Sequence, residues 1–314
     1  MQPAVQRILE QMERSGYVTD PDIATAVYLA MELRKPLLIE GQAGVGKTEV
    51  AKVLAHMLSV DLIRLQCYEG LDVNTALYEW NYPKQMLRIK MEEHDHRGVA
   101  EKESEIFSEE FLLKRPLLEA ITRHDRSPVL LIDEVDRADE EFEAFLLEVL
   151  SDFQVSIPEI GTVKATHIPY VVLTSNRTRE LSDALRRRCL YFWVDYPSFQ
   201  KEIRVVKTKV PGINELLAEQ ICLFMQGIRT VRLIKTPGVA ETLDWSLALA
   251  SLHRDHLDRE TVEETLACVF KDNRDIQKVV GKRLDVLLTA VEADGKEPAS
   301  AIPDLKEQLA ALES

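Results

Sequence analysis

The sequence lacks several features that mark large classes of proteins. No apolar stretch approaches the ~18 residues that a membrane helix needs. The N-terminus, MQPAVQRILEQMERSGYV, has no apolar core of the signal-peptide type. The 314 residues include only 4 cysteines, and none of them forms a CxxC pair, so zinc-ribbon and thioredoxin-type sites have no support. Because sparse, unpaired cysteines fit a reducing compartment, we expect a cytoplasmic protein without a transmembrane segment, which a partner could still hold at a membrane.

Positive charge is also scarce. The chain has 39 Lys and Arg residues against 53 Asp and Glu residues, which gives a formal net charge of −14. A surface that coats nucleic acid needs basic side chains, so this balance argues against that function, although a local basic patch remains compatible with it. The hydrophobic share of 46% is typical of a globular protein, and the length predicts about two domains.

The apolar pattern predicts an α/β region followed by an all-helical one. Short apolar runs predict buried strands at 37–40, 61–65, 129–133, 170–174 and 190–194, with helical spacing at 3–14, 21–33 and 46–58. Near Pro197 the pattern changes, and only helical periods follow. We therefore expect an α/β domain over residues 1–197 and a helical domain over residues 198–314.

Two segments interrupt the α/β pattern. Residues from about 66 to 127 form a candidate insertion, whose part 92–110 is rich in acids, including Glu92, Glu93 and Asp95, and is expected to be solvated. Its last part, Leu112–Arg123, has helical spacing. Alternating apolar residues over about 155–168, on both sides of Ile160-Gly161, predict a β-hairpin.

A glycine-rich segment follows the first predicted strand and opens a helix. It matches GxxxxGK[ST] in full, in the strand-and-helix context that gives this pattern its meaning. Glycines let backbone N–H groups cradle phosphates, and the helix N-terminus adds a positive dipole end. Lys47 should reach the β- and γ-phosphates of ATP, and the Thr48 hydroxyl should bind Mg²⁺. The candidate nucleotide-binding residues are Gly41, Gln42, Ala43, Gly44, Val45, Gly46, Lys47, Thr48 and Glu49.

Polar residues at the ends of two later strands complete the pattern of a nucleotide hydrolase. The apolar run Leu130–Ile132 ends in Asp133 and Glu134, at the edge where open α/β sheets bind ligands. We expect Asp133 to hold Mg²⁺ through water and Glu134 to orient and activate the attacking water. Asn176, just past the run that ends at Thr174, is either a turn residue or an amide that helps to hold that water.

Three consecutive arginines, Arg186, Arg187 and Arg188, precede Cys189. They fit a solvated helix end, since cations are favourable there. They also fit an arginine finger that reaches the γ-phosphate held by a neighbouring subunit, which stabilises the charge of the transition state.

With these elements in this order, the chain resembles the AAA+ ATPases. The resemblance implies a five-stranded parallel sheet of order 5-1-4-3-2 with a helical lid domain. Within the AAA+ proteins, the hairpin and the long insertion are similar to those of the MoxR family. Two segments resemble sequences of one MoxR branch, which is encoded beside von Willebrand factor A proteins and includes the carbon-monoxide-dehydrogenase maturation ATPases. These segments are LTSNRTRELSDALRRRCLYFWVDYPS and TPGVAETLDW.

This resemblance implies a function and several residue roles. It implies a chaperone that forms a homo-oligomeric ring, expected to be hexameric, with a von Willebrand factor A domain protein and a metalloenzyme client as partners. It gives Asn176 the sensor-one role, makes Arg188 the first choice for the finger and Arg187 the second, and puts Tyr17 and Val18 beside adenine. At the second sensor arginine of many AAA+ proteins this chain has Gly238, so Arg232 or Lys235 would have to replace it, or the role is missing.

Two other functions stay open at this point. One is a nucleic-acid-dependent AAA+ motor or loader, against which the negative charge weighs. The other is a nucleotide-regulated binding switch with little turnover, which the missing sensor arginine leaves open. A GTPase is disfavoured because the sequence has no Asn-Lys-x-Asp text for guanine.

Overall fold

The computed structural model describes residues 2–91, 98–291 and 298–312. The chain divides into two compact units. Unit 1 consists of Met1–Ser15, Thr19–Gly41 and Lys47–Trp193, and unit 2 of Gly16–Val18, Gln42–Gly46 and Val194–Ser314. None of the described helices is both long and apolar enough to cross a membrane.

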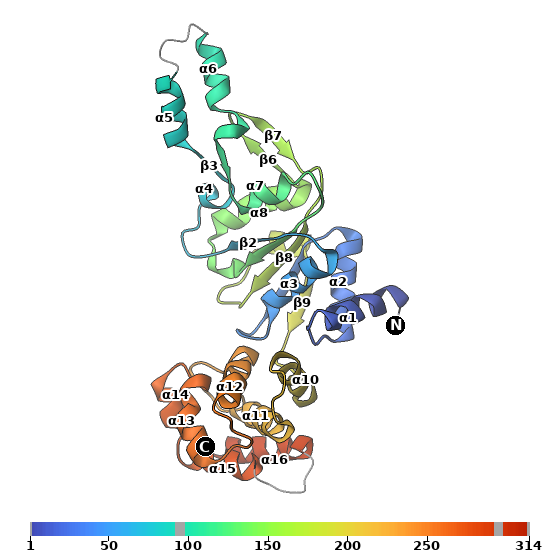
Figure 1. Cartoon of the computed structure of the whole chain (residues 1–314), viewed down its shortest axis with the longest axis vertical. Coiled ribbons are helices and arrows are strands. Elements are labelled where there is room, and N and C mark those ends of the chain that lie inside the picture. Colours follow the sequence, from blue (N-terminus) through green and yellow to red (C-terminus); the bar gives the residue numbers. More distant parts are fainter. Residues whose placement is uncertain (1, 92–97, 292–297, 313–314) are drawn as a thin grey trace. The chain divides into compact units, whose positions relative to one another are not determined.

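The core of unit 1 is a five-stranded sheet (Figure 1). Its strands lie in the order β2-β5-β8-β1-β9, and β5 pairs in parallel with β2 and β8, as β1 does with β8. Counted along the chain, this is the expected order 5-1-4-3-2, which is thereby confirmed. The strands are β1 (Leu37–Gly41), β2 (Leu62–Gln66), β5 (Val129–Asp133), β8 (Tyr170–Ser175) and β9 (Leu190–Val194).

Several helices begin where the sequence supplies a cap or a proline. Pro21 stands in the first turn of α2, and the Asp139 carboxylate accepts the Phe142 N–H at 2.8 Å at the start of α8. Helix α3 packs against β1, β5 and β8, and α7 packs against β2 and β5. These helices are α1 (Pro3–Arg14), α2 (Pro21–Leu33), α3 (Lys47–Leu58), α7 (Pro116–Ile121), α8 (Glu140–Asp152) and α9 (Asp183–Arg188).

Parts of the segment 66–127 on both sides of its acidic stretch belong to the core of unit 1. Leu77, Trp80 and Phe111 lie in the hydrophobic core of unit 1. The described part of its acidic stretch includes Glu105, which pairs with Arg88, whereas Glu92, Glu93 and Asp95 lie outside the described residues. Besides α7, its elements are α4 (Val73–Ala76), β3 (Tyr78–Trp80), α5 (Tyr82–Met91), α6 (Val99–Ile106), η1 (Glu109–Phe111) and β4 (Leu112–Lys114).

The expectation of a helix over Leu112–Arg123 was wrong at its start and at its end. Residues Leu112–Lys114 form β4, which pairs antiparallel with β3, and helix α7 covers only Pro116–Ile121. Pro116 opens α7 because a proline is favoured in the first turn of a helix, and it disfavours helical backbone at the residue before it. A strand partner that is distant in the sequence thus overrode the local helical spacing.

The segment 155–168 contains an antiparallel hairpin. Strand β6 (Gln154–Ile157) pairs with β7 (Gly161–Lys164), and Ile157 lies opposite Gly161. Gly161 has φ +95°, in the left-handed region that favours glycine. Val155 and Ile157 face the core of unit 1.

Seven helices follow β9 in unit 2, within the described part of that unit. They enclose a second core around Trp245, whose indole N–H donates to the Thr265 hydroxyl at 2.8 Å. The helices are α10 (Phe199–Lys209), α11 (Glu215–Ile228), α12 (Val239–Ser251), α13 (Arg259–Val269), α14 (Asn273–Val279), α15 (Lys282–Val291) and α16 (Pro298–Ala311).

Candidate nucleotide-binding site

The backbone after β1 turns sharply before α3 begins at Lys47. Gly44 has φ +73° and Gly46 has φ +90°, conformations that side chains with a Cβ rarely adopt. Gly46 is one of the two glycines that the GxxxxGK[ST] pattern requires, whereas Gly44 occupies one of its variable positions. The turn ends at the N-terminus of α3, where the helix dipole favours an anion.

The Lys47 side chain bridges the end of β1 and the residue that follows β8. Its Nζ donates to the Gly41 carbonyl at 2.9 Å and to Asn176 Oδ1 at 2.7 Å. Lys47 is only 6% exposed. Burial lowers the pKa of Lys47, and the nearby carboxylates of Asp136, Asp133 and Glu134 oppose this shift. An anionic ligand would therefore be a favourable partner for this partly desolvated ammonium group.

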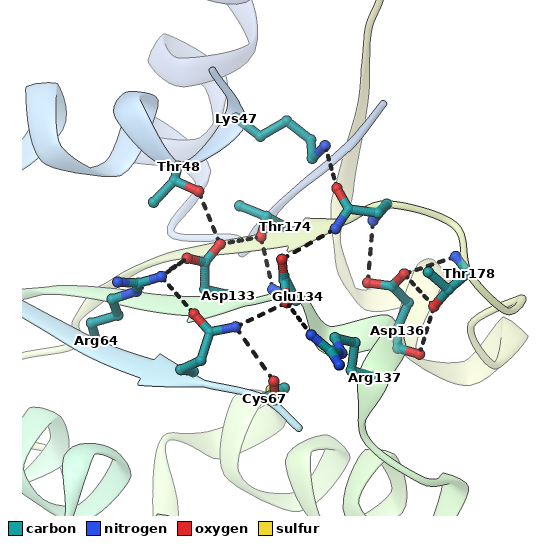
Figure 2. Close-up of polar contacts among 12 residues, drawn as sticks. Lys47, Thr48, Arg64, Cys67, Asp133, Glu134, Asp136, Arg137, Thr174 and Thr178 are labelled. Carbon is teal, nitrogen blue, oxygen red and sulfur yellow. Dashed lines mark hydrogen bonds and ion pairs between the residues drawn. The ribbon is translucent and has the colours of Figure 1, made fainter. Parts of the chain in front are cut away.

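The Asp133 carboxylate is nearly buried, and its two oxygens accept hydrogen bonds from different residues (Figure 2). Its Oδ1 accepts hydrogen bonds from the Thr48 hydroxyl at 3.0 Å and from the Thr174 hydroxyl at 2.5 Å. Its Oδ2 accepts from Arg64 Nε at 3.1 Å and from Arg64 Nη2 at 2.5 Å. The structure thus brings together Thr48 and Asp133, the two residues expected to hold Mg²⁺.

These donors fit magnesium. A hydroxyl and a carboxylate are the hard oxygen ligands that Mg²⁺ prefers, and Mg²⁺ usually keeps several waters and shares the phosphates of a nucleotide. The described residues contain no group of three or more His, Cys, Asp and Glu side chains that could hold a metal ion. A site of this kind needs none, since the nucleotide would supply the other ligands.

Glu134 lies beside this pair and is held by three side chains (Figure 2). Gln66 Nε2 donates to its carboxylate at 3.1 Å, Asn176 Nδ2 at 3.3 Å and Arg137 Nη1 at 3.3 Å. Its backbone is left-handed, with φ 55°, and its N–H donates to the Thr174 hydroxyl at 2.9 Å. Contacts from three other elements hold this strained conformation, which is how such outliers persist at functional sites.

Sequence reasoning missed the second buried acid of this region. Asp136 accepts hydrogen bonds from the Asn176 N–H at 3.2 Å, the Thr178 N–H at 2.8 Å and the Thr178 hydroxyl at 2.7 Å. These hydrogen bonds attach the loop containing Asn176 to the turn that follows β5. The position of Asp136, three residues after Asp133, could have marked it as a further candidate. Only the fold shows that its carboxylate binds the backbone N–H groups of Asn176 and Thr178.

Two polar residues of β2 and one of β8 were also missed. Arg64 and Gln66 are two residues apart and so lie on one face of β2, and Gln66 is the register partner of Asp133. Thr174 is the last residue of the apolar run in β8 that was interpreted as buried strand. Their alternation with apolar residues was visible in the sequence, whereas their pairing with Asp133 and Glu134 depends on strand order.

The three arginines of α9 do not join this cluster. Arg186 Nη2 lies 3.4 Å from Glu40 Oε2, and Arg188 donates to the Ser151 hydroxyl at 2.8 Å and to the Ala184 carbonyl at 3.1 Å. Arg187 is exposed. Within the described chain, Arg188 therefore has no hydrogen bond to Asp133 or Glu134.

The remaining candidates lie in unit 2. Tyr17 and Val18 are partly buried and belong to the segment of the chain that links α1 to α2. Gly238 precedes α12, and its N–H donates to Glu241 Oε2 at 2.8 Å. Arg232 and Lys235 lie in the segment between α11 and α12.

Comparison with known proteins agrees with this fold. Residues 36–189 match the AAA domain of the dynein-related subfamily. An uncharacterized protein of Staphylococcus epidermidis is 26% identical over 207 residues, covering 64% of this chain and 70% of that protein. Another, from Staphylococcus saprophyticus, is 22% identical over 300 residues, covering 90% of this chain and 99% of that protein.

A solved structure shows the same architecture. A variant of RuvB from Thermotoga maritima has a TM-score of 0.50 at 16% identity, covering 98% of this chain and 88% of that chain. At this identity the likeness shows the fold alone. The matched AAA domain and the strand order together establish an AAA+ P-loop NTPase fold with C-terminal helices.

Proposed function

We propose that this protein binds ATP with Mg²⁺ and hydrolyses it. The observation that carries the proposal is the cluster of Lys47, Thr48, Asp133, Glu134 and Asn176, joined by hydrogen bonds at the carboxyl ends of adjacent strands. Parallel α/β sheets bind their ligands at this edge. A glycine-rich loop, a lysine, a hydroxyl and an acidic pair are what phosphoryl transfer to water requires.

Each residue has a distinct task in this proposal. The loop Gly41–Gly46 binds the phosphates through its N–H groups, Lys47 binds the β- and γ-phosphates, and Glu49 lies in the first turn of the helix that follows. Thr48 and Asp133 hold Mg²⁺, Asp133 through water, and the cation would neutralise charge on the phosphates. Glu134 takes the proton of the attacking water and Asn176 orients that water. Tyr17 and Val18 contact adenine.

We further propose that hydrolysis occurs at the interface between copies in a ring. Arg188, or Arg187 as the second choice, would reach the γ-phosphate bound by a neighbouring copy. In support, Arg188 makes no hydrogen bond to the acidic pair of its own described chain. Residues 1–197 would act as the nucleotide-binding domain and residues 198–314 as a helical lid.

The biological role that we propose is that of a MoxR-type chaperone. The ring, expected to be hexameric, would remodel a client metalloenzyme in the cytoplasm together with a von Willebrand factor A domain protein. The support is the resemblance of the residues around Asn176 and Gly238 to that family. All four cysteines are free, in keeping with a reducing compartment.

Steady-state hydrolysis tests the proposal. Purified protein should release phosphate from ATP only when Mg²⁺ is present, and the Lys47→Ala variant should have lost most of its ATP affinity. Unchanged ATP binding by that variant would contradict the role of the loop. Severalfold stimulation by single- or double-stranded nucleic acid would favour a nucleic-acid motor instead, and nucleotide binding without turnover would favour a switch.

A pull-down identifies the client. The Glu134→Gln variant should hold ATP without hydrolysing it, so a remodelled protein should stay bound to it in ATP and leave in ADP. Lys47→Ala is the matched control, because it should not enter the ATP state. Equal recovery of proteins on both variants would contradict ATP-dependent remodelling.

A further inference from the structure

We propose that Arg64 is the resting counter-ion of Asp133 and that hydrated Mg²⁺ displaces it when a nucleotide binds. The inference rests on the proposed function, since it concerns the same carboxylate. It adds a positioning residue that the nucleotide-binding pattern does not contain. It also predicts the sign of the effect of Arg64 on the magnesium requirement.

The first argument is that the two carboxylate oxygens of Asp133 accept hydrogen bonds from different groups. Oδ1 accepts hydrogen bonds from the hydroxyls of Thr48, in the first turn of α3, and of Thr174, in β8. Oδ2 is taken entirely by the Arg64 guanidinium, at 3.1 and 2.5 Å. A carboxylate that binds a hydrated cation must accept hydrogen bonds from the waters of that cation. Because Oδ1 already accepts from two hydroxyls, these waters would bind Oδ2, where Arg64 is a competing donor.

The second argument is the difference in exposure between the partners. The Asp133 side chain is 3% exposed and the Arg64 side chain is 52% exposed. A nearly buried carboxylate is costly without a positive partner. An exposed arginine, by contrast, can leave for water at little cost, because its guanidinium stays solvated. This asymmetry suits an exchange of one cation for another.

The third argument is that Arg64 is also connected to Glu134. Arg64 Nη2 donates to Gln66 Oε1 at 2.5 Å, and Gln66 Nε2 donates to Glu134 Oε2 at 3.1 Å (Figure 2). Departure of Arg64 from Asp133 would loosen one support of the Gln66 amide. The state of Asp133 would thus affect the hold on the carboxylate that activates water.

Magnesium titrations test the inference. Binding of a fluorescent ADP analogue is measured against Mg²⁺ concentration for the wild type, Arg64→Ala, Arg64→Lys and Arg115→Ala. Arg115 is the matched control, because it pairs with Glu79 at 2.6 Å and is 43% exposed, in the same unit. If Arg64 competes with the cation, Arg64→Ala should reach half-saturation at about threefold to tenfold less Mg²⁺. Arg64→Lys should be intermediate, and Arg115→Ala should match the wild type.

Thermal unfolding gives a second readout without turnover. In the absence of metal and nucleotide, Arg64→Ala should melt below the wild type, because Asp133 has lost its counter-ion. With Mg²⁺ and ADP the two midpoints should converge, since the cation then neutralises Asp133 in both proteins. Arg115→Ala should show the same difference from the wild type in both conditions.

The opposite outcomes overturn the inference. An Arg64→Ala variant that needs as much Mg²⁺ as the wild type, or more, would mean that Arg64 does not compete with the cation. A stability difference that persists with Mg²⁺ and ADP would mean that Arg64 stays on Asp133. If the wild type itself shows no Mg²⁺-dependent ADP binding, the proposed function fails, and the inference fails with it.

Discussion

Each unit of the molecule contains an arginine paired with a buried carboxylate, but the two arginines differ in exposure. In unit 1, Arg64 reaches Asp133 from a half-exposed position. In unit 2, Arg229 binds Glu202 with both side chains enclosed, at 6% and 0% exposure. The two pairs have the same charges, so the difference lies in whether water can receive the arginine when it leaves.

The buried pair in unit 2 lies in a network of hydrogen bonds. Arg229 makes two hydrogen bonds to Glu202, at 2.7 and 2.6 Å, and also donates to the Pro237 carbonyl and the Thr242 hydroxyl. Gln226 and Thr242 donate to the remaining positions of the carboxylate. These contacts join α10, α11 and the start of α12. A buried pair of this kind fixes structure, whereas the half-exposed pair in unit 1 is free to exchange partners.

Breaking the buried pair should have the largest effect. Glu202→Ala or Arg229→Ala should each lower the free energy of unfolding by about 3–5 kcal/mol, because the remaining charge stays buried and unpaired. Denaturant unfolding measures it. The double variant Glu202→Leu with Arg229→Met should lose less than either single variant. Additive losses would contradict the argument that the unpaired charge is the cause.

Removing an exposed arginine should affect catalysis instead. Arg188→Ala should keep ATP binding but lose about 10³-fold in turnover, if it acts as a finger on a neighbouring copy. Phosphate release measures the loss. Mixing Arg188→Ala with Glu134→Gln subunits should restore part of the activity, since the two groups then come from different chains. No restoration would leave a finger in trans without support.

The carboxylate of Glu134 should matter for turnover and little for folding. Glu134→Gln should lower turnover by about 10²-fold or more, because the amide cannot accept a proton from water. ATP affinity should stay near that of the wild type in equilibrium binding. Near-normal turnover would contradict the role assigned to Glu134. A large loss of unfolding free energy would mean that Glu134 stabilises the fold, as the buried pair in unit 2 does.

Titration of Lys47 should produce the smallest effect. As pH rises, it should lower nucleotide affinity and raise the stability of the nucleotide-free protein. Burial lowers its pKa below the ordinary value of 10.5. As pH rises through the lowered pKa, nucleotide affinity should fall by about tenfold or less, since the phosphates lose a cation. The nucleotide-free protein should gain stability in the same window, because the unfolded chain then binds more protons than the folded one.

Binding and unfolding measured at several pH values check this. The Lys47→Arg variant is the control, because arginine stays charged throughout the range. Its nucleotide affinity should be flatter with pH than that of the wild type. Identical pH profiles for the two proteins would assign the change to other groups.

Much of unit 1 could be predicted from local pattern. The apolar run Val129–Ile132 predicted a buried strand, and the GxxxxGK[ST] pattern predicted a glycine-rich turn that opens a helix. Both depend on residues that are adjacent in the chain. The strand Leu112–Lys114 was missed because its identity depends on β3, more than thirty residues earlier, and not on its own spacing.

The sequence alone predicted which residues would bind phosphate and activate water, because Lys47, Thr48, Asp133 and Glu134 are the residue types that this chemistry needs, at fixed spacing. Only the tertiary structure decided what surrounds them. Arg64 and Asp133 are 69 residues apart and meet because β2 and β5 are neighbours in the sheet. Strand order is set by the packing of the whole core, so the counter-ion of a buried carboxylate, and its freedom to leave, cannot be inferred from the residues beside it in the chain.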